Sequence, residues 1–241
     1  MNTKFSMALM PIYMMVLSGF VVLAVSWGHV ATTMSVISPN TERHIVIIDA
    51  GHGGVDGGAT SCTGVLESNI NLEIALKLND MMHLLGMETL MIRETDISVY
   101  TEGETIAHKK VSDLKERVRI INQANNPLLI SIHQNTFPQE KYWGMQVFYA
   151  KTDCSKDLAE QMQDSFRKTL SPGNPRKAKK SEGIYLMEKV LCPAVLIECG
   201  FLSNPVEEAK LRNDDYQKEL CTVIACICSQ YLMQSADQDI L

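Results

Sequence analysis

Residues 45–54 read Ile-Val-Ile-Ile-Asp-Ala-Gly-His-Gly-Gly, and this stretch guides the interpretation of the whole chain. An apolar β-branched run that leads into a glycine-rich turn is typical of a buried strand that ends in a tight bend. His52 lies in that bend, where the neighbouring glycines let the backbone turn without Cβ clashes. The stretch therefore predicts a strand with a chemically capable side chain just beyond its carboxyl end.

Strand and helix patterns alternate along the rest of the chain. Short apolar runs predict further strands at 87–92, 128–132, 145–149 and 194–198. Caps and helical spacing predict helices that begin at Ser68 or Asn69, Ser112, Ser155, Asn204 and Asp214, the first ending at Gly86 and the last near Met233. A basic connection with Pro and Gly, residues 171–180, interrupts the pattern. This alternation favours the α/β class: a single αβα domain with a mostly parallel, twisted sheet and helices on both faces.

The amino-terminal segment differs from the rest of the chain. No Asp, Glu, Lys or Arg lies between Lys4 and Glu42, and residues 7–27 are almost continuously apolar. About 20 such residues can cross a bilayer as a helix, and the positive amino side places the remainder across the membrane. We therefore expect an exported, extracytoplasmic protein in which residues 1–30 form a hydrophobic helix. Whether that helix is a cleaved signal peptide or an anchor stays open.

The remaining domain boundaries follow from the same patterns. Residues 31–42 are predicted to be a linker, residues 43–234 the folded domain and residues 235–241 a carboxyl-terminal tail. The composition, with 46% apolar and 21% charged residues, is that of a folded protein. A net charge of −6 argues against nucleic acid as a partner. Seven cysteines without a CxxC pair predict buried free thiols, with one disulfide left open.

Side chains that can bind metals or transfer protons lie where the predicted strands end. His52 follows the first strand, His133 follows the run at 128–132, and Glu198 closes the run at 194–198. Glu67 lies at the amino end of a predicted helix and can fold back over the same edge of the sheet. Two imidazoles and a carboxylate are the ligand set of a catalytic zinc site. From spacing alone, a metal site and ordinary surface residues are both open.

The motifs resemble those of the zinc-dependent N-acetylmuramoyl-L-alanine amidases, the family-3 cell-wall amidases. The resemblance runs from Arg43 to Leu232 and is carried by these stretches: the quoted residues 45–54, Gly-Val-Leu-Glu at 64–67, Arg93 with Asp96, Leu114 with Arg117, Ser-Ile-His-Gln-Asn at 131–135, and Leu-Ile-Glu-Cys-Gly-Phe-Leu-Ser-Asn at 196–204. It implies that His52, Glu67 and His133 are ligands of Zn²⁺. It also implies that Glu198 is the catalytic carboxylate, and that residues 43–234 are a catalytic domain.

A narrower similarity points to the spore-cortex amidases of endospore formers. Arg176-Lys-Ala-Lys-Lys, Gly183-Ile-Tyr-Leu-Met and Pro193 ahead of Leu-Ile-Glu carry it. This similarity implies that the substrate is cortex peptidoglycan, whose stem peptides are removed so that muramic δ-lactam can form for germination enzymes to recognise. It places the enzyme in the forespore intermembrane space. An activating protein partner, and the membrane itself if the amino-terminal segment is uncleaved, are further expected partners.

Several positions leave alternatives. Gln134 and Cys199 depart from the family pattern, but neither is expected to touch a ligand, so they bear on substrate fit. Arg93 is expected either to pair with acids near this edge or to bind substrate, and Asn135 to contact the site or the substrate. The basic residues at 176–180 form either a solvated loop or a contact for wall polymer or a protein. Other functional classes are a zinc-dependent deacetylase or carboxypeptidase of the wall, and a catalytically silent wall-binding module.

Overall fold

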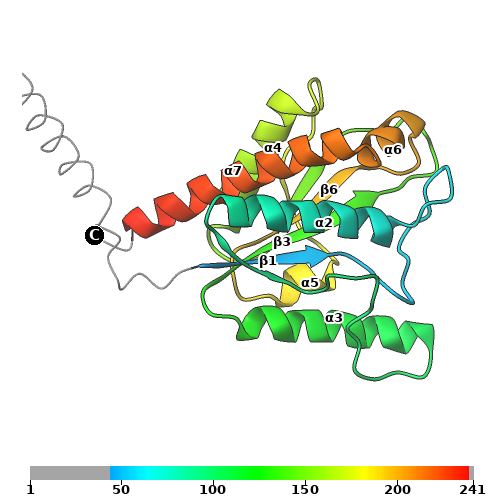
Figure 1. Ribbon diagram of the computed structural model, residues 1–241, viewed down its shortest axis with the longest axis horizontal. Helices are drawn as coiled ribbons and strands as arrows, with labels where there is room; N and C mark the ends of the chain where they lie inside the picture. The colour runs from blue at the N-terminus through cyan, green and yellow to red at the C-terminus, as the bar shows by residue number, and fades with distance from the viewer. Residues whose placement is uncertain (1–43, 239–241) are drawn as a thin grey trace, which may run out of the picture. The chain divides into compact units, whose positions relative to one another are not determined.

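Strand β1 spans Ile45–Ala50, so the quoted apolar run forms the predicted strand. The computed structural model describes residues 44–238 (Figure 1). The predicted hydrophobic helix at 1–30 and the linker at 31–42 lie outside the described residues. Among the residues that are described, no helix is both long enough and apolar enough to span a membrane.

β1 lies inside a six-stranded sheet with the order β2-β1-β3-β6-β4-β5. The other strands are β2 (Glu88–Met91), β3 (Pro127–Asn135), β4 (Gln146–Tyr149), β5 (Lys179–Lys180) and β6 (Ala194–Phe201). The pairs β1–β2, β1–β3, β3–β6 and β4–β5 are parallel, and only β4 runs antiparallel to β6. The predicted mostly parallel sheet is therefore confirmed, and the carboxyl ends of β1, β3 and β6 share one edge.

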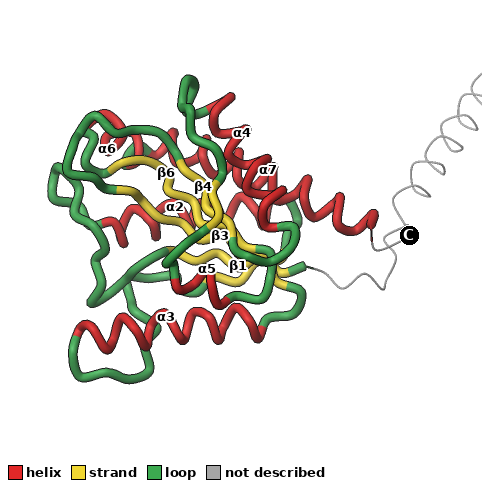
Figure 2. The backbone as a smooth tube through the Cα atoms, turned by 180° about the vertical axis from the view of Figure 1, so that it is seen from behind, coloured by secondary structure: helices red, strands yellow, loops and turns green. Residues whose placement is uncertain are grey.

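Helices cover both faces of this sheet (Figures 1 and 2). They are α2 (Glu67–Leu84), α3 (Ile106–Gln123), α4 (Ser155–Thr169), α5 (Tyr185–Lys189), α6 (Pro205–Leu211) and α7 (Asp214–Gln238). Alternate residues of each strand point to opposite faces. One core cluster thus joins the strands to α2, α4 and α7, and the other joins them to α3 and α5. The predicted αβα layering is confirmed.

Some element boundaries differ from the sequence-based expectation. α3 begins at Ile106 rather than at Ser112, because the Thr105 side chain accepts a hydrogen bond from the His108 backbone N–H at 3.2 Å. Ile106 in the first turn of α3 is 61% exposed. This turn does not pack against the core, so the sequence there has no apolar stripe that would have predicted a helix. α7 continues past Met233 to Gln238, and α5, which has only five residues, was not predicted. The connection at 171–180 contains the short strand β5.

All seven cysteines lie in the described part of the chain, and none forms a disulfide. Cys192, Cys199, Cys221 and Cys228 are buried, as expected for small apolar side chains. Cys62, Cys154 and Cys226 are exposed, so for these three the predicted burial is wrong. They lie in the turn before α2, at the start of α4 and on the outer side of α7, where no core packs over them.

Candidate metal centre

The fold brings the four predicted site residues to one edge of the sheet. His133 in β3 lies directly opposite Glu198 in β6 in the parallel register. His52 lies in the turn that follows β1, and Glu67 is the first residue of α2. Their convergence agrees with the general rule that ligands of open α/β sheets bind beyond the carboxyl ends of the strands.

Three of these side chains form a group that could hold a metal ion. His52 Nε2 lies 3.3 Å from Glu67 Oε2, and His133 Nδ1 lies 3.1 Å from Glu67 Oε1. One ligand atom from each of the three residues lies within 4.8 Å of the others. The two imidazole rings meet edge to face, with centroids 5.0 Å apart and an interplanar angle of 73°.

These distances fit the chemistry of zinc. Imidazole and carboxylate ligands lie about 2.0–2.1 Å from a tetrahedral zinc ion, which places neighbouring ligand atoms roughly 3.3–3.4 Å apart. The 3.3 Å from His52 Nε2 to Glu67 Oε2 is close to that spacing, and His133 Nδ1 lies 3.1 Å from the other oxygen of the same carboxylate. Two nitrogen donors and one carboxylate also leave one position of a tetrahedron open, as catalytic zinc sites do. The donor set therefore suits a catalytic zinc.

The ionisation of the group shows how strongly it attracts positive charge. Burial alone would lower the pKa of His52, but hydrogen bonds to Glu67 and Asp56 and their negative charges raise it to about 9. Burial would raise the pKa of Glu67, but the hydrogen bonds and charges of His133 and His52 hold it far below its usual range. A carboxylate so placed needs a cation beside it. The two imidazoles, or a metal bound by them, meet that need.

Glycines let the backbone lie directly against the side chains of His133 and Glu67. A Cβ on Gly51 would lie 2.2 Å from His133 Nε2, so no larger residue fits there with the ring in place. Gly58, at a φ of +68°, has a similar constraint, because a Cβ would lie 2.7 Å from Glu67 Oε2. His52 itself has a φ of 62°, which is uncommon for a residue with a side chain and is typical of functional sites.

A second layer of contacts orients the candidate ligands. Asp56 Oδ2 lies 2.8 Å from His52 Nδ1, and Lys110 Nζ lies 2.7 Å from the other oxygen of Asp56. This contact to Nδ1 leaves Nε2 of His52 to face the group, the arrangement commonly seen around metal-bound histidines. The sequence reasoning missed both residues. The four-residue spacing between His52 and Asp56 was the available signal, whereas Lys110 comes from the part of α3 that was not predicted to be helical.

Glu67 is fixed by three donors besides the histidines. The backbone N–H groups of Ala59 and Gln134 each donate to it at 3.0 Å, and the Asn71 side chain donates at 3.3 Å. The expectation that Gln134 touches no ligand is therefore wrong. Its backbone binds Glu67, and its side chain donates to Asn71 Oδ1 at 3.2 Å.

Glu198 is partly buried, and one oxygen of its carboxyl group is enclosed without a partner. Its Oε2 atom has no hydrogen bond among the described residues and is shielded from solvent. Burial raises the pKa of Glu198 to about 7, against the opposing charge of His133. An acid whose pKa lies near neutrality, beside a candidate metal site, is suited to accept and return a proton.

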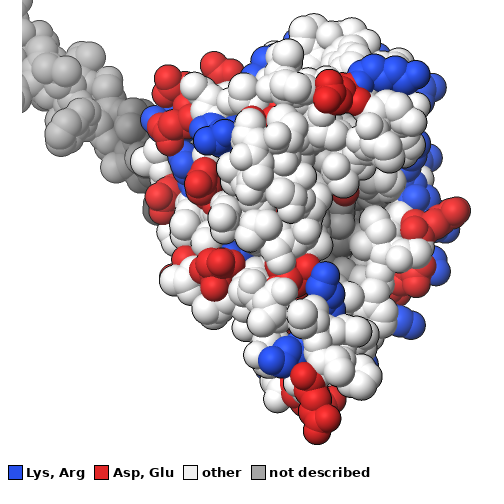
Figure 3. Space-filling model, turned by 90° about the vertical axis from the view of Figure 1, so that its right-hand side faces the viewer, with Lys and Arg blue, Asp and Glu red and all other residues white. Residues whose placement is uncertain are grey.

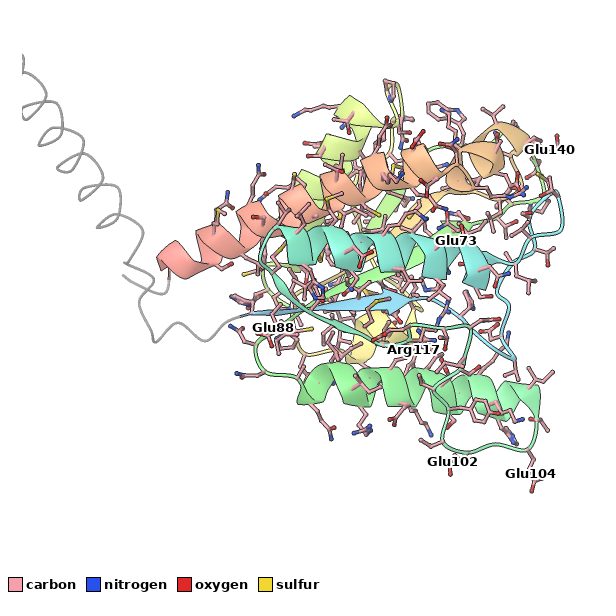
Figure 4. All side chains as sticks on the ribbon, viewed as in Figure 1. Glu73, Glu88, Glu102, Glu104, Arg117 and Glu140 are labelled. Carbon is pink, nitrogen blue, oxygen red and sulfur yellow. The ribbon has the colours of Figure 1, made fainter. Side chains whose placement is uncertain are left out.

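Two buried arginines support this edge. Arg93, which is 2% exposed, donates to the backbone carbonyls of Ala50, Gly51, Ser68 and Thr95. Its expected pairing with acids is therefore wrong, because the carbonyls of the turn satisfy the guanidinium. Arg117 reaches from α3 toward the sheet (Figure 4), where it pairs with buried Asp49 and donates to the His52 carbonyl at 2.7 Å. Both arginines thus hold the turn that carries His52.

A cleft of about 440 Å³ opens beside the candidate ligands. Its walls come from the β1 turn, β3, α3 and α5, and include His52, His133, Asp56, Lys110, Leu114 and Tyr185. Figure 3 shows a hollow on the face at the right-hand end of Figure 1, with mainly uncharged surface around it. The site is therefore open to a ligand of considerable size.

Comparison with known proteins identifies the family. The family model described as N-acetylmuramoyl-L-alanine amidase matches residues 46–227. The chain belongs to this family. The germination-specific N-acetylmuramoyl-L-alanine amidase of Bacillus subtilis (strain 168) is 38% identical over 195 residues, which cover 80% of this chain and 81% of that protein. The family-3 resemblance is thereby confirmed, and the protein is a cell-wall amide hydrolase.

Solved structures of the family share the fold. The CwlD amidase from Clostridioides difficile, solved in complex with the GerS lipoprotein, has a TM-score of 0.75 and 38% identity, covering 80% of this chain and 99% of that one. An N-acetylmuramoyl-L-alanine amidase from Clostridium difficile 630 has a TM-score of 0.68 and 30% identity, covering 80% of this chain and 98% of the other. This chain thus covers almost the whole length of both solved chains.

Proposed function

We propose that this family member is a zinc-dependent amidase of the spore cortex, with His52, Glu67 and His133 as the metal ligands and Glu198 as the catalytic carboxylate. The observation that carries the proposal is the enclosed Oε2 atom of Glu198, which has no hydrogen bond among the described residues. Glu198 is in register with His133, one of the three donors that lie within 4.8 Å of one another. A zinc ion held there would act as a Lewis acid toward the scissile carbonyl and would make water more acidic.

The role of Glu198 follows from its position and its pKa. As a carboxylate it accepts a proton from the attacking water, whose oxygen forms a bond to the lactyl carbonyl carbon of N-acetylmuramic acid. As a carboxylic acid it then gives that proton to the departing nitrogen of L-alanine, and the carbon–nitrogen bond breaks. A pKa of about 7 makes both protonation states accessible near neutrality. The products are the lactyl carboxylate of the sugar and a free stem peptide.

The test is the Glu198→Gln variant of the full chain, purified in mild detergent and supplied with zinc. We expect native metal content and a loss of turnover of about 10²–10⁴-fold, the usual contribution of a general base. Glu219→Gln, which makes the same change at an exposed position of α7, is the matched control and should keep full activity. Native turnover of Glu198→Gln with stoichiometric metal would disprove the assigned role.

The masses of the products distinguish the reaction classes. On intact peptidoglycan, an amidase releases whole stem peptides, a deacetylase releases acetate and a carboxypeptidase releases a terminal amino acid. A wall-binding module releases nothing. We expect whole stem peptides, in a zinc-dependent manner, and His52→Ala should lose the metal.

The relatives support the cellular setting that we propose. One relative is named germination-specific, and another was solved in complex with a lipoprotein. We infer that this chain acts outside the cytoplasm on cortex peptidoglycan, prepares muramic δ-lactam formation and binds an activating protein partner. Production of the chain in spores that lack their own cortex amidase should restore muramic δ-lactam. Cortex without the lactam, despite an exported and zinc-loaded enzyme, would contradict this setting.

A further inference from the structure

Exposed aromatic rings gather beside the candidate metal centre. Phe137, Tyr142 and Trp143, named here the aromatic ledge, are 46%, 36% and 42% exposed. Phe137 and Tyr142 meet edge to face at 4.6 Å between centroids, and Tyr142 stacks on buried Phe201 at 6.3 Å. Trp143 is the next residue in the chain after Tyr142. Exposed aromatic side chains that lie together on a folded domain mark a binding surface more often than isolated ones do.

The segment that carries the ledge is held in place by hydrogen bonds. The backbone N–H of Phe137 donates to Ser203 Oγ at 3.1 Å, and Asn204 Nδ2 donates to the Glu140 carbonyl at 2.8 Å. The Gly144 N–H donates to Glu207 Oε1 at 2.9 Å. The rings are therefore presented on a fixed support, which lowers the entropy cost of binding a ligand to them.

A basic residue from the connection before β5 completes this support. Arg176 donates to the Trp143 carbonyl at 3.3 Å, and its guanidinium lies 5.1 Å from the centroid of the Phe201 ring. Arg176 is thereby engaged in packing beneath the ledge. This packing gives Arg176 a structural role, so its place in the basic stretch at 176–180 does not require contact with an anionic wall polymer.

The ledge follows a proposed metal ligand closely in the chain, and none of its rings lines the cleft. Phe137 follows His133 by four residues, at most about 13 Å of extended chain. The label at Glu140 in Figure 4 marks this segment beside α6, whereas the cleft is lined by residues of α3 and α5. Two chemically different surfaces thus lie near the metal ligands: the aromatic ledge, and a cleft whose walls include the paired charges of Lys110 and Asp113.

The substrate of the family also has two different arms. The amide bond joins a neutral, stiff glycan to a charged, extended peptide, so the arms leave the reaction centre in different directions. We propose that the aromatic ledge binds the glycan strand by stacking the Phe137 and Trp143 rings on the apolar faces of the sugar rings, which leaves the cleft for the stem peptide. The Tyr142 ring supports them, because Phe201 stacks on it and Lys141 Nζ lies over it, 5.5 Å from its centroid. This inference rests on the proposed function, because it needs the reaction centre to lie between the two surfaces.

Glycan suits the ledge better than an acidic or lipid ligand does. The aromatic rings offer apolar faces to the C–H faces of a sugar ring, and Trp143 and Tyr142 also carry a polar group that suits its hydroxyl rim. Glu140 and Lys141 lie in the same segment with opposite charges, so the ledge does not select an ion of one sign. Three exposed rings along one segment also suit a repeating polymer of rings.

Fluorescence tests the proposal without requiring catalysis. The chain has two tryptophans, Trp27 and Trp143, so in the Trp27→Phe variant the ledge residue is the only tryptophan, which is excited selectively over the tyrosines. The full chain in mild detergent is titrated with glycan strands stripped of their peptides, and separately with free stem peptides. We expect a saturable change in emission with the glycan strands and none with the peptides.

Variants in the Trp27→Phe background show whether the ledge itself is responsible. Phe137→Ala should weaken glycan binding about tenfold, equivalent to about 1.4 kcal/mol, whereas Phe137→Tyr, which keeps the ring, should bind as the parent does. Leu84→Ala is the control, since this residue is 80% exposed at the far end of α2. Glycan affinity that is unchanged in folded Phe137→Ala overturns the proposal.

The outcomes also separate this inference from the proposed function. Glu198→Gln should bind glycan strands normally although it lacks turnover, so a failed assignment of the catalytic carboxylate leaves the binding result intact. Conversely, if stem peptides are released normally but glycan strands cause no change in emission, the ledge proposal is wrong and the proposed function still stands. If Phe137→Ala binds glycan normally and loses only its response to a lipoprotein partner, the ledge is a protein interface and the proposal is wrong.

Discussion

Replacement of Gly51 by Ala should disable the site through a single methyl group. Its φ lies outside the left-handed region, so alanine can adopt the backbone conformation. The added Cβ would nevertheless lie 2.2 Å from Nε2 and 2.3 Å from Cε1 of His133. Ordinary van der Waals contact begins near 3.4 Å, so the ring has to move by more than an ångström.

The size of the effect follows from that displacement. A shift of about 1 Å in a catalytic constellation can cost about 10²-fold in rate. His133 is 19% exposed, so its ring can swing toward solvent and the fold can survive. We therefore expect kcat/KM to fall about 100-fold and zinc to be lost to a chelator more readily. The unfolding free energy should fall by no more than the roughly 1–3 kcal/mol typical of overpacking.

Gly57→Ala is the matched control for this prediction. It lies in the same turn with a φ outside the left-handed region, and its added Cβ would meet only the flexible end of Leu66 at 3.0 Å. Stem-peptide release, zinc content and chemical unfolding are measured for both variants. Native turnover and native zinc affinity in Gly51→Ala would refute the claim that the absence of a side chain at position 51 is needed for the position of the His133 ring.

Two further predictions concern residues around the ligands. Asp56→Ala removes the oxygen that lies 2.8 Å from His52 Nδ1. It should weaken zinc binding about 10–100-fold in a chelator competition. Lys110→Met leaves the Asp56–His52 contact in place and should weaken zinc binding less. The second concerns acid stability. Burial opposes ionisation of Asp49, but Arg117, His133 and Ser131 hold its pKa below the ordinary 3.8. The stabilisation is therefore present above the unfolded pKa and is lost as pH falls through the lower folded value, below about pH 4. Urea unfolding should show a smaller acid loss in Asp49→Asn, and an equal loss would contradict the pair's role.

The fold could be predicted because its strands are short, continuous apolar runs. Ile45–Ala50 and Ala194–Phe201 are buried on both faces and lie between turn signals. Such runs specify parallel strands in an αβα sandwich, and the side chains that end them must then share an edge. For that reason His52, His133 and Glu198 could be placed together from the sequence alone.

What the sequence did not predict are contacts between distant, individually unremarkable residues. Lys110 reaches Asp56 from a helical turn whose apolar residues face solvent, so no periodic stripe marked it. The burial of Arg117 against Asp49 joins residues 68 positions apart, which no local pattern encodes. The exposed rings at 137–143 lie in a loop, where sequence patterns say least about side-chain direction.

The pairing register of β3 and β6 determines whether His133 and Glu198 lie side by side. Because side chains alternate between the faces of a strand, a slip of one residue between β3 and β6 would turn His133 or Glu198 to the opposite face. Their alignment is fixed by the buried pairs Leu129–Ala194 and Ser131–Leu196 that precede it. Just beyond it the pairing shifts, so that Asn135 lies opposite Phe201. Bulges of this kind re-aim side chains at sheet edges. The shift begins immediately after the two proposed functional residues. The same irregularity therefore places Phe201, the ring on which Tyr142 of the ledge stacks, opposite Asn135 at the end of the paired strands.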